Sequence, residues 1–287
     1  MNIMETIGKP MDRAIVATIC GDAGTGKTSL AATFPNPIFI RAEDGMQSIP
    51  EGQRPDAFPV LKDVAQIWDQ LIALLQSEHS YQTLVIDSVT ALEALFVQDV
   101  LDRDKRARSI NQAFGGYGAG PAAVATMHRR VRKAVGLLNV RKGMHVVFVA
   151  HAEIETMRLP DSDDYMRYSL RLPAKSLPPY IDDVDLVGFV KLVSIVRGED
   201  GERKKATSTG DRELIVAATA ANVSKNRFGI VDSLDFVPGI NPLGGLVPGL
   251  PAPVRTGPTK AKKPAADKPT TDKPAADVAA TDGDVIE

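Results

Sequence analysis

Short, continuous runs of apolar residues alternate along the chain with segments whose apolar residues recur every three or four positions. The continuous runs, residues 14–20, 38–41, 83–88, 144–151 and 184–193, are rich in β-branched residues and predict buried strands, and residues 214–218 predict an edge strand. The periodic segments, residues 29–34, 64–75, 89–100 and 122–140, predict helices. Strands that alternate with helices indicate an α/β fold with a mostly parallel central sheet flanked by helices.

A glycine-rich loop connects the first predicted strand to the first predicted helix. Its residues, Gly21, Asp22, Ala23, Gly24, Thr25, Gly26, Lys27 and Thr28, match the phosphate-binding pattern G-x-x-x-x-G-K-[ST] in full, and Ser29 follows. Glycines allow the tight curl in which successive N–H groups point at the phosphates of a nucleotide, Lys27 adds a positive charge, and the Thr28 hydroxyl suits Mg²⁺. A glycine turn that binds nothing is the alternative, and the agreement of strand, loop and helix argues against it. We therefore predict a site for ATP and Mg²⁺.

Acidic residues follow two other predicted strands. Asp87, in the run at 83–88, is expected to hold Mg²⁺ beside Thr28, as the acid of a Walker B strand does; the alternative is a helix N-cap. Many ATPases carry the carboxylate that activates water immediately after this acid, but here Ser88 follows, so that group has to come from elsewhere. Glu43, after the strand at 38–41, is the best-placed candidate and Asp44 the second, and a surface carboxylate without a role is the alternative.

The bulk composition excludes some classes of protein. A chain of 287 residues with a formal net charge of −2 has no global basic field, so a site for a polyanion has to be a local patch. Cys20 is the only cysteine, which excludes an internal disulfide framework, and no cluster of Cys and His indicates a zinc site. No segment approaches the roughly 20 apolar residues that span a bilayer. We expect a cytoplasmic protein without membrane contact.

Two segments combine basic and aromatic residues and are candidates for contact with single-stranded DNA. In the first, Arg103, Lys105, Arg106 and Arg108 precede a glycine-rich stretch that contains Phe114 and Tyr117; in the second, Arg158, Arg167 and Tyr168 belong to a predicted hairpin of residues 154–158 and 165–169. Cations can follow the phosphates while rings stack on the bases. Asp102 and Asp104 reduce the positive charge of the first segment, and a solvated loop is the alternative.

Composition divides the chain into three parts. Residues 1–12 form an N-terminal arm, residues 13–237 one ATPase domain, and residues 238–287 a tail dominated by proline, alanine, lysine, threonine and aspartate. In the tail the pentad Lys-Pro-x-x-Asp recurs from Lys263, Lys268 and Lys273. This composition cannot bury a core and predicts disorder. The acidic end of the tail, which contains one apolar pair, is a candidate docking site for a single-strand-binding or replication protein; a tip that mimics DNA is the alternative.

These motifs, in this order, make residues 13–236 resemble the RecA-type ATPases, and more closely the compact phage ATP-binding proteins of that superfamily that act in single-strand annealing. Residues 38–45 are similar to the recombinase strand whose last glutamate activates the attacking water, which implies that role for Glu43. Residues 85–92 resemble the Walker B stretch of the family. His151 falls where RecA has a glutamine that couples the γ-phosphate to a DNA-binding loop, which implies a sensor role.

The same resemblance implies an interface between subunits. Ser224, Lys225, Asn226 and Arg227 look like the family turn whose two cations, here Lys225 and Arg227, stabilise the transferring phosphoryl group on a neighbour's nucleotide. Without the family, a solvated pair of charges explains this turn equally well. RecA also has an N-terminal helix and strand that dock on the next subunit, and a folded C-terminal domain. Because this chain has a short arm and a tail instead, we expect a homo-oligomeric ring or short filament.

The resemblance thus implies a DNA-stimulated ATPase that binds single-stranded DNA and promotes annealing and homologous recombination, with Mg-ATP hydrolysed at a subunit interface. Two alternatives remain open. One is a RecA-fold helicase-type motor or loader at a replication fork. The other is a nucleotide-gated protein switch or a small-molecule kinase, although a kinase would need a lid with clustered arginines and the predicted hairpin carries scattered ones.

Overall fold

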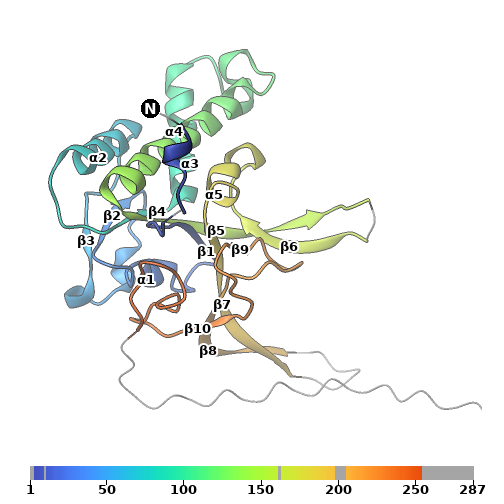
Figure 1. Cartoon of the computed structure of the whole chain (residues 1–287). Helices are drawn as coiled ribbons and strands as arrows, with labels where there is room; N and C mark the ends of the chain where they lie inside the picture. Colours follow the sequence, from blue (N-terminus) through green and yellow to red (C-terminus); the bar gives the residue numbers. More distant parts are fainter. Residues whose placement is uncertain (1–2, 10, 161–162, 198–204, 254–287) are drawn as a thin grey trace, which may run out of the picture. The chain divides into compact units, whose positions relative to one another are not determined.

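The chain folds around a central sheet whose inner strands are parallel (Figure 1), in a computed structural model that describes residues 3–9, 11–160, 163–197 and 205–253. The strands are β1 (Val16–Gly21), β2 (Pro37–Arg41), β3 (Asp56–Ala57), β4 (Thr83–Asp87), β5 (His145–Met157), β6 (Tyr165–Leu170), β7 (Leu186–Arg197), β8 (Lys205–Ile215), β9 (Lys225–Asn226) and β10 (Leu234–Phe236). The α-helices are α1 (Lys27–Ala31), α2 (Val64–Gln76), α3 (Val89–Arg103), α4 (Ala119–Lys142) and α5 (Pro178–Ile181). Short 3₁₀ segments are η1 (Ile3–Thr6), η2 (Met46–Ser48), η3 (Glu51–Gln53), η4 (Ile110–Gly115) and η5 (Ala174–Ser176).

The order of strands across the sheet is β10-β8-β7-β1-β5-β4-β2-β3. Strands β7, β1, β5, β4, β2 and β3 run parallel, and β8 and β10 continue the sheet antiparallel at one edge. The mostly parallel sheet with flanking helices that the sequence predicts is therefore confirmed. Two local predictions differ: the first helix ends at Ala31, and Leu214 belongs to the long strand β8, so β10 is the edge strand instead.

Successive residues of β1 face opposite sides of the sheet, as the strand geometry requires. Val16 and Cys20 belong to the hydrophobic cluster under α2, α3 and α4, whereas Ile15, Ala17 and Ile19 belong to the cluster on the α1 side. Both faces of the inner strands are thus buried, which explains why these strands read as continuous apolar runs.

The C-terminal segment after β10 completes the second face of the sheet. The sequence analysis begins its disordered tail at residue 238, but the structure describes the chain as far as Pro253 and buries Leu243, Val247 and Leu250 in the cluster that contains α1. The predicted boundary is therefore too early, because three apolar side chains in a Pro- and Gly-rich segment can cover a sheet without forming a helix. Residues 254–287, with the repeated pentad, lie outside the described residues.

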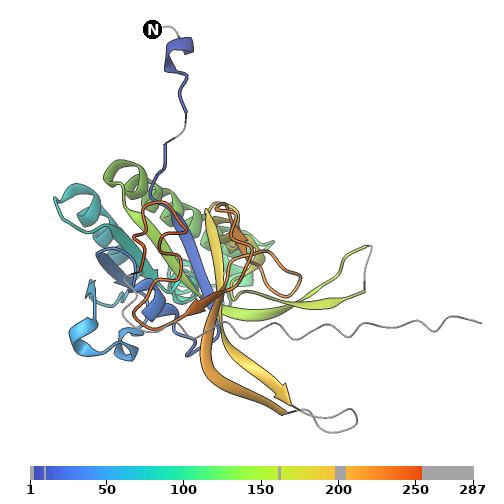
Figure 2. The same ribbon diagram turned by 60° about the horizontal axis from the view of Figure 1, so that its bottom comes forward.

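Two antiparallel ribbons extend from the sheet in different directions (Figure 2). Beyond His151, β5 leaves the parallel sheet and pairs with β6 from Ala152↔Leu170 to Met157↔Tyr165, so the predicted hairpin is confirmed apart from its turn residues 161–162, which lie outside the description. The second ribbon is formed by β7 and β8.

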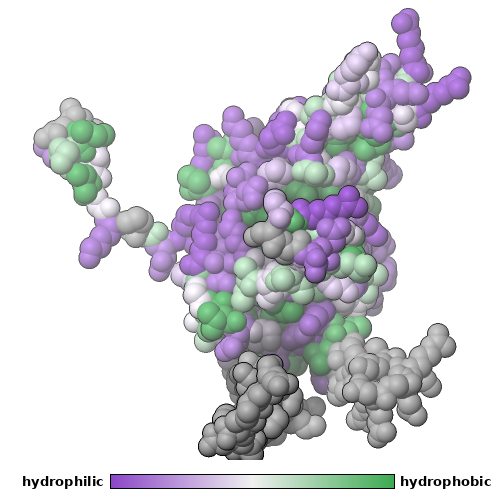
Figure 3. Space-filling view, turned by 90° about the vertical axis from the view of Figure 1, so that its right-hand side faces the viewer, coloured by the Kyte–Doolittle hydropathy of each residue, from purple (hydrophilic) through white to green (hydrophobic). Residues whose placement is uncertain are grey.

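The N-terminal arm exposes apolar side chains. Ile3, Met4, Ile7 and Met11 are 65% or more exposed, and the arm forms the lobe with green surface at the left of Figure 3. Elsewhere on that face, hydrophilic side chains separate small apolar patches. No helix among the described residues has the length and apolar character needed to cross a bilayer.

Candidate nucleotide-binding site

The glycine-rich loop lies between the end of β1 and the start of α1, as the sequence predicts. Gly24 and Gly26 have φ values of 75° and 95°, in the left-handed region that glycine adopts without steric cost. Gly21 is confined by its neighbours, because a Cβ there would lie 2.4 Å from the Val190 carbonyl oxygen of β7. Thr25 tightens the curve by donating its hydroxyl to the Asp22 carbonyl at 2.9 Å. The loop therefore has the backbone geometry that a phosphate cradle requires.

Lys27 lies at the base of this loop. Its Nζ donates to the Asp22 carbonyl oxygen at 2.8 Å, and its side chain is largely buried. Burial lowers the pKa of Lys27, because desolvation penalises the charged ammonium. The Asp22 carbonyl oxygen is a neutral acceptor that a phosphate oxygen can replace. An anion beside Lys27 would favour the charged form of its ammonium group.

Thr28 and Asp87 form the pair expected of a Mg²⁺ site. The Thr28 hydroxyl donates to Asp87 Oδ2 at 2.7 Å, and burial raises the pKa of Asp87. The alternative that Asp87 caps the following helix is wrong: Ser88 is the N-cap of α3, and its side chain accepts from Ala91 N. A buried carboxylate beside a hydroxyl, next to a phosphate loop, suits the hard oxygen coordination of Mg²⁺. Among the described residues, no three His, Cys, Asp or Glu side chains gather as an all-protein metal site.

Glu43 and His151 meet at the carboxyl edge of the sheet. His151 Nε2 lies 3.1 Å from Glu43 Oε1, and because a carboxylate only accepts, this nitrogen is the donor. The hydrogen bond from His151, followed by one from Ser88, lowers the pKa of Glu43 to about 2 against the opposing effect of burial. Asp44, the second candidate, instead pairs with Arg41 at 3.2 Å and is half exposed.

One cavity of about 660 Å³ joins these groups. It is lined by Ala23, Gly24, Gly26, Lys27, Thr28 and Ser29 of the loop region and by Glu43, Asp87 and His151, so the structure brings the predicted site residues together. It is also lined by Ser48, Ile49, Pro50, Gln53, Arg212, Pro238 and Gly239, which the sequence analysis did not single out. Arg212 and Gly239 come from the far edge of the sheet, and no local motif marks them.

Lys225 and Arg227 lie at the opposite, amino edge of the sheet. Strand β9 pairs with the first residues of β7, Leu186↔Asn226 and Val187↔Lys225, whereas the phosphate loop follows the last residue of β1. Lys225 Nζ donates to the carbonyl oxygens of Ile181 and Asp182 at the end of α5, and Arg227 pairs with Asp185 at 3.1 Å. In this chain, neither cation is near the nucleotide cavity.

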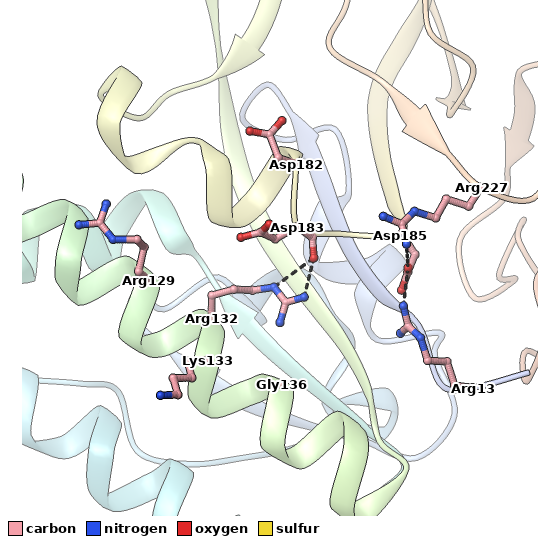
Figure 4. Close-up of a pocket in the computed structure, with 9 residues that line it drawn as sticks. All are labelled: Arg13, Arg129, Arg132, Lys133, Gly136, Asp182, Asp183, Asp185 and Arg227. Atoms are coloured by element: carbon pink, nitrogen blue, oxygen red, sulfur yellow. Dashed lines mark hydrogen bonds and ion pairs between the residues drawn. The ribbon is translucent and has the colours of Figure 1, made fainter. Parts of the chain in front are cut away.

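A second cavity, of about 580 Å³, opens beside Arg227 (Figure 4). Arg13 and Arg227 bind the same Asp185 carboxylate from two sides, and Arg132 of α4 donates to the Asp183 carbonyl oxygen. Arg129 and Lys133, also on α4, line the cavity and make no ion pair with any residue the structure describes. Five cations face three aspartates here, so the cavity carries a positive excess.

The first candidate DNA segment presents its aromatic residues to solvent. Tyr117 is fully exposed and Phe114 is 46% exposed, and both have positive φ values, which are uncommon for bulky residues. Asp104 supports this conformation by accepting from Phe114 N at 2.7 Å. Two of the four predicted cations are paired, Arg103 with Asp99 and Lys105 with Asp102, whereas Arg106 and Arg108 are exposed and their side chains have no ion pair within the described part of the chain.

In the second candidate segment the predicted residues contact other protein groups. Arg167 donates twice to Glu155 Oε1, at 3.0 and 2.6 Å, and the Tyr168 ring packs 4.8 Å from that of Phe189. Arg158 is 82% exposed and lies 3.4 Å from Asp164. Arg158 is thus the predicted residue of this hairpin that remains open to solvent.

The comparisons with known proteins agree with this geometry. A family model described as AAA domain matches residues 13–228. The SPbeta prophage-derived uncharacterized protein YorG of Bacillus subtilis (strain 168) is 24% identical over 221 residues, which are 76% of this chain and 61% of that protein. The match therefore spans about three fifths of that relative's length.

Two solved structures are also similar. The KaiC-like protein PH0186 from Pyrococcus horikoshii OT3 has a TM-score of 0.44 and 13% identity over 84% of this chain and 92% of that one. The RadB recombinase has a TM-score of 0.45 and 11% identity over 79% of this chain and 90% of that one.

The family model covers most of the chain, and it begins just before the strand that leads into the phosphate loop. The P-loop ATPase domain expected from the sequence is confirmed, and such a fold implies a bound nucleotide and usually Mg²⁺. The chain belongs to the AAA domain family.

Proposed function

We propose that this protein is a DNA-stimulated ATPase that binds single-stranded DNA and promotes annealing in homologous recombination. The observation that carries the proposal is the cavity that joins the phosphate loop, Asp87 and Glu43 at one edge of the sheet, together with a cationic cavity around Arg227 at the other. A phage origin is supported by the prophage named in the description of the B. subtilis relative.

The residues of the first cavity divide the work of ATP hydrolysis. The loop amides and Lys27 hold the phosphates, and Thr28 and Asp87 hold Mg²⁺, which neutralises charge on the transferring phosphoryl group. Glu43 orients the attacking water. Because a carboxylate with a pKa of about 2 is a weak base, positioning of the water by Glu43 contributes more than removal of its proton. His151 holds Glu43 and begins the hairpin β5–β6, so it can relay the state of the nucleotide to that hairpin.

The separation of the two cavities favours hydrolysis between subunits. Arg227 cannot reach the phosphate loop of its own chain from the opposite edge of the sheet, so it can act only on the nucleotide of another copy. A contact between the amino edge of one subunit and the carboxyl edge of the next is heterologous, and such contacts generate rings or open filaments. Lys225 and Arg227 would then act in trans, with Lys225 released from the end of α5.

The N-terminal arm supports the same assembly. Its exposed apolar residues include Ile3 and Ile7, and a four-residue 3₁₀ segment has no core of its own. Burial of these side chains against a second copy of the chain would release apolar surface from water. The arm is therefore assigned to contact between subunits.

The loop between α3 and α4 is the favoured contact with single-stranded DNA. Tyr117 and Phe114 offer rings to solvent, and Arg106 and Arg108 supply cations nearby in the chain. Each base stacked on an aromatic ring contributes about 1–3 kcal/mol of binding free energy, without dependence on base identity. Such a loop suits a protein that binds strands of any sequence before annealing them.

ATP hydrolysis should be measured at low salt with and without single-stranded DNA, using wild type, Lys27→Ala and Tyr117→Ala. We expect strong stimulation by DNA, which Lys27→Ala abolishes and Tyr117→Ala weakens, whereas Tyr165→Ala, on the hairpin, serves as an aromatic control. Complementary strands should be annealed by the wild type, whose ATP hydrolysis is stimulated by DNA, and not by a variant that loses this stimulation. ATP binding without any response to DNA would contradict the recombination function and favour a nucleotide-gated switch. Directional unwinding without annealing would favour a helicase-type motor.

A further inference from the structure

Arg212 lines the nucleotide cavity from the side opposite the Mg²⁺ site. It lies on β8, two strands from β1 across the sheet, with β7 between them. Asp87 ends β4, which is two strands from β1 in the other direction, with β5 between them. Arg212 and Asp87 therefore flank the phosphate loop from its two sides.

Within the described part of the chain, no protein group satisfies the buried Nε of Arg212. No carboxylate among the described residues pairs with the guanidinium group. Other half-buried cations of the fold are satisfied, as Arg167 is by Glu155. A buried donor without a partner costs free energy, so this geometry favours a ligand that accepts from it.

The side chain of Arg212 packs directly against the phosphate loop. A Cβ at Gly26 would lie 3.5 Å from Arg212 Nε and 3.1 Å from Phe236 Cε1, so the loop, the guanidinium and the ring are in mutual contact. Phe236 lies opposite Arg212 in the ladder of β8 and β10 and holds its stem. The cation is thus held in a fixed place beside the residue that precedes Lys27.

We propose that Arg212 is a nucleotide-binding residue that acts on its own subunit's ligand and contacts the α- and β-phosphates. It lies away from Glu43 and His151, which face the bond that is hydrolysed, so its contacts are present with ATP and with ADP. An arginine binds phosphate oxygens through paired, charge-assisted hydrogen bonds. This role rests on the nucleotide binding of the proposed function. Arg212 would strengthen binding of the nucleotide in the ground state, whereas Arg227 would act in trans on the transition state.

The test is the affinity of the full chain for ATP, ADP and AMP, measured by calorimetry without DNA. Arg212→Met keeps the apolar stem on Phe236 and removes the charge, and Arg212→Lys keeps the charge. The matched control is Lys191→Met, which removes a cation paired with Glu213 at 2.9 Å on the same ribbon. We expect Arg212→Met to weaken ATP and ADP by the same factor, about tenfold or more, with a smaller effect on AMP. Arg212→Lys should recover part of the loss.

Equal affinity of wild type and Arg212→Met for ADP would overturn the inference, and a loss confined to ATP would move the contact to the γ-phosphate and overturn the assignment. If Arg212→Met does not fold, the comparison of Arg212→Lys with wild type decides in the same way, because the paired geometry of arginine is lost in lysine. A wild-type chain that binds no nucleotide would instead refute the proposed function itself.

Discussion

His151 Nε2 donates a hydrogen bond to Glu43 Oε1 at 3.1 Å, across the end of β4. The two residues are 108 positions apart in the sequence and come together because β2, β4 and β5 are neighbours in the sheet. This contact joins the residue that we propose orients water to the residue from which the β5–β6 hairpin departs.

Glu43→Gln should retain ATP binding and lose turnover by roughly 10²–10⁴-fold, because a neutral amide cannot accept from water as a carboxylate does. Rapid-mix hydrolysis assays with a parallel binding measurement test this. Asp44→Asn is the matched control, since Asp44 is exposed and its ion pair among the described residues is with Arg41. A fully active Glu43→Gln chain would assign the base to another residue.

His151→Ala should raise the pKa of Glu43 from about 2 toward its ordinary value, since the largest favourable contact of the carboxylate is lost. Glu43 is active when ionised, so the acid limb of the pH–rate profile should move to higher pH in the variant. The carboxyl ¹³C shift of Glu43, followed by NMR as pH is lowered, measures the pKa directly. An unchanged titration would mean that Ser88 and Lys27 alone hold the carboxylate ionised.

Leu243→Ala should lower the free energy of unfolding by about 2–5 kcal/mol, as for other fully buried leucines. Leu243 is fully buried, whereas Leu246 is 48% exposed, so Leu246→Ala is a control from the same segment. Chemical denaturation of both variants distinguishes them. Equal, small effects would show that residues 238–253 contribute little to the folded domain.

Acid should destabilise the fold through His145. Burial lowers the pKa of His145, and its Nδ1 accepts from Ile15 N at 3.1 Å. In the unfolded chain His145 is protonated near pH 6.5, whereas in the folded chain its protonation requires a lower pH. The free energy of unfolding should therefore fall as pH drops below about 6.5, by at most about 1.4 kcal/mol per pH unit. Denaturation at pH 7.5 and 5.5 should show a smaller difference for His145→Asn than for wild type.

Arg227→Ala should bind ATP normally and hydrolyse it roughly 10³-fold more slowly, as expected for loss of an arginine finger. Lys27→Ala should be inactive because its own phosphate site is impaired, whereas it keeps Arg227. An equimolar mixture of the two variants should therefore regain activity at mixed interfaces. Arg13→Ala is the control, since it also removes one partner of Asp185. If the mixture hydrolyses ATP no faster than the two variants do separately, Arg227 does not take part in catalysis.

The sequence predicts what is local or follows from parallel strands. Gly21 to Thr28 form one uninterrupted segment of sequence, and Asp87 meets Thr28 because the carboxyl ends of the parallel strands lie at one edge of the sheet. The sequence predicts Glu43 from its position after a strand and His151 from family resemblance, but their contact depends on strand order, which a single sequence does not contain.

Arg212 and the segment after Phe236 were missed for different reasons. Arg212 reaches the cavity through antiparallel pairing at the far edge of the sheet, and one arginine between Asp211 and Glu213 gives no signal. For residues 238–253 a signal exists: Leu243, Val247 and Leu250 recur at intervals of four and three within the Pro- and Gly-rich composition.

If Arg227 acts on a neighbour's nucleotide as we propose, the two cavities at opposite edges of one sheet give every subunit a donor end and an acceptor end. In an open row of subunits, the nucleotide at one end has no neighbouring Arg227. In a closed ring, every nucleotide lies beside the Arg227 of a neighbour. Turnover per subunit would therefore rise with length in an open row and stay constant in a ring. The rate of hydrolysis, measured against protein concentration, would then report whether the assembly has closed on itself.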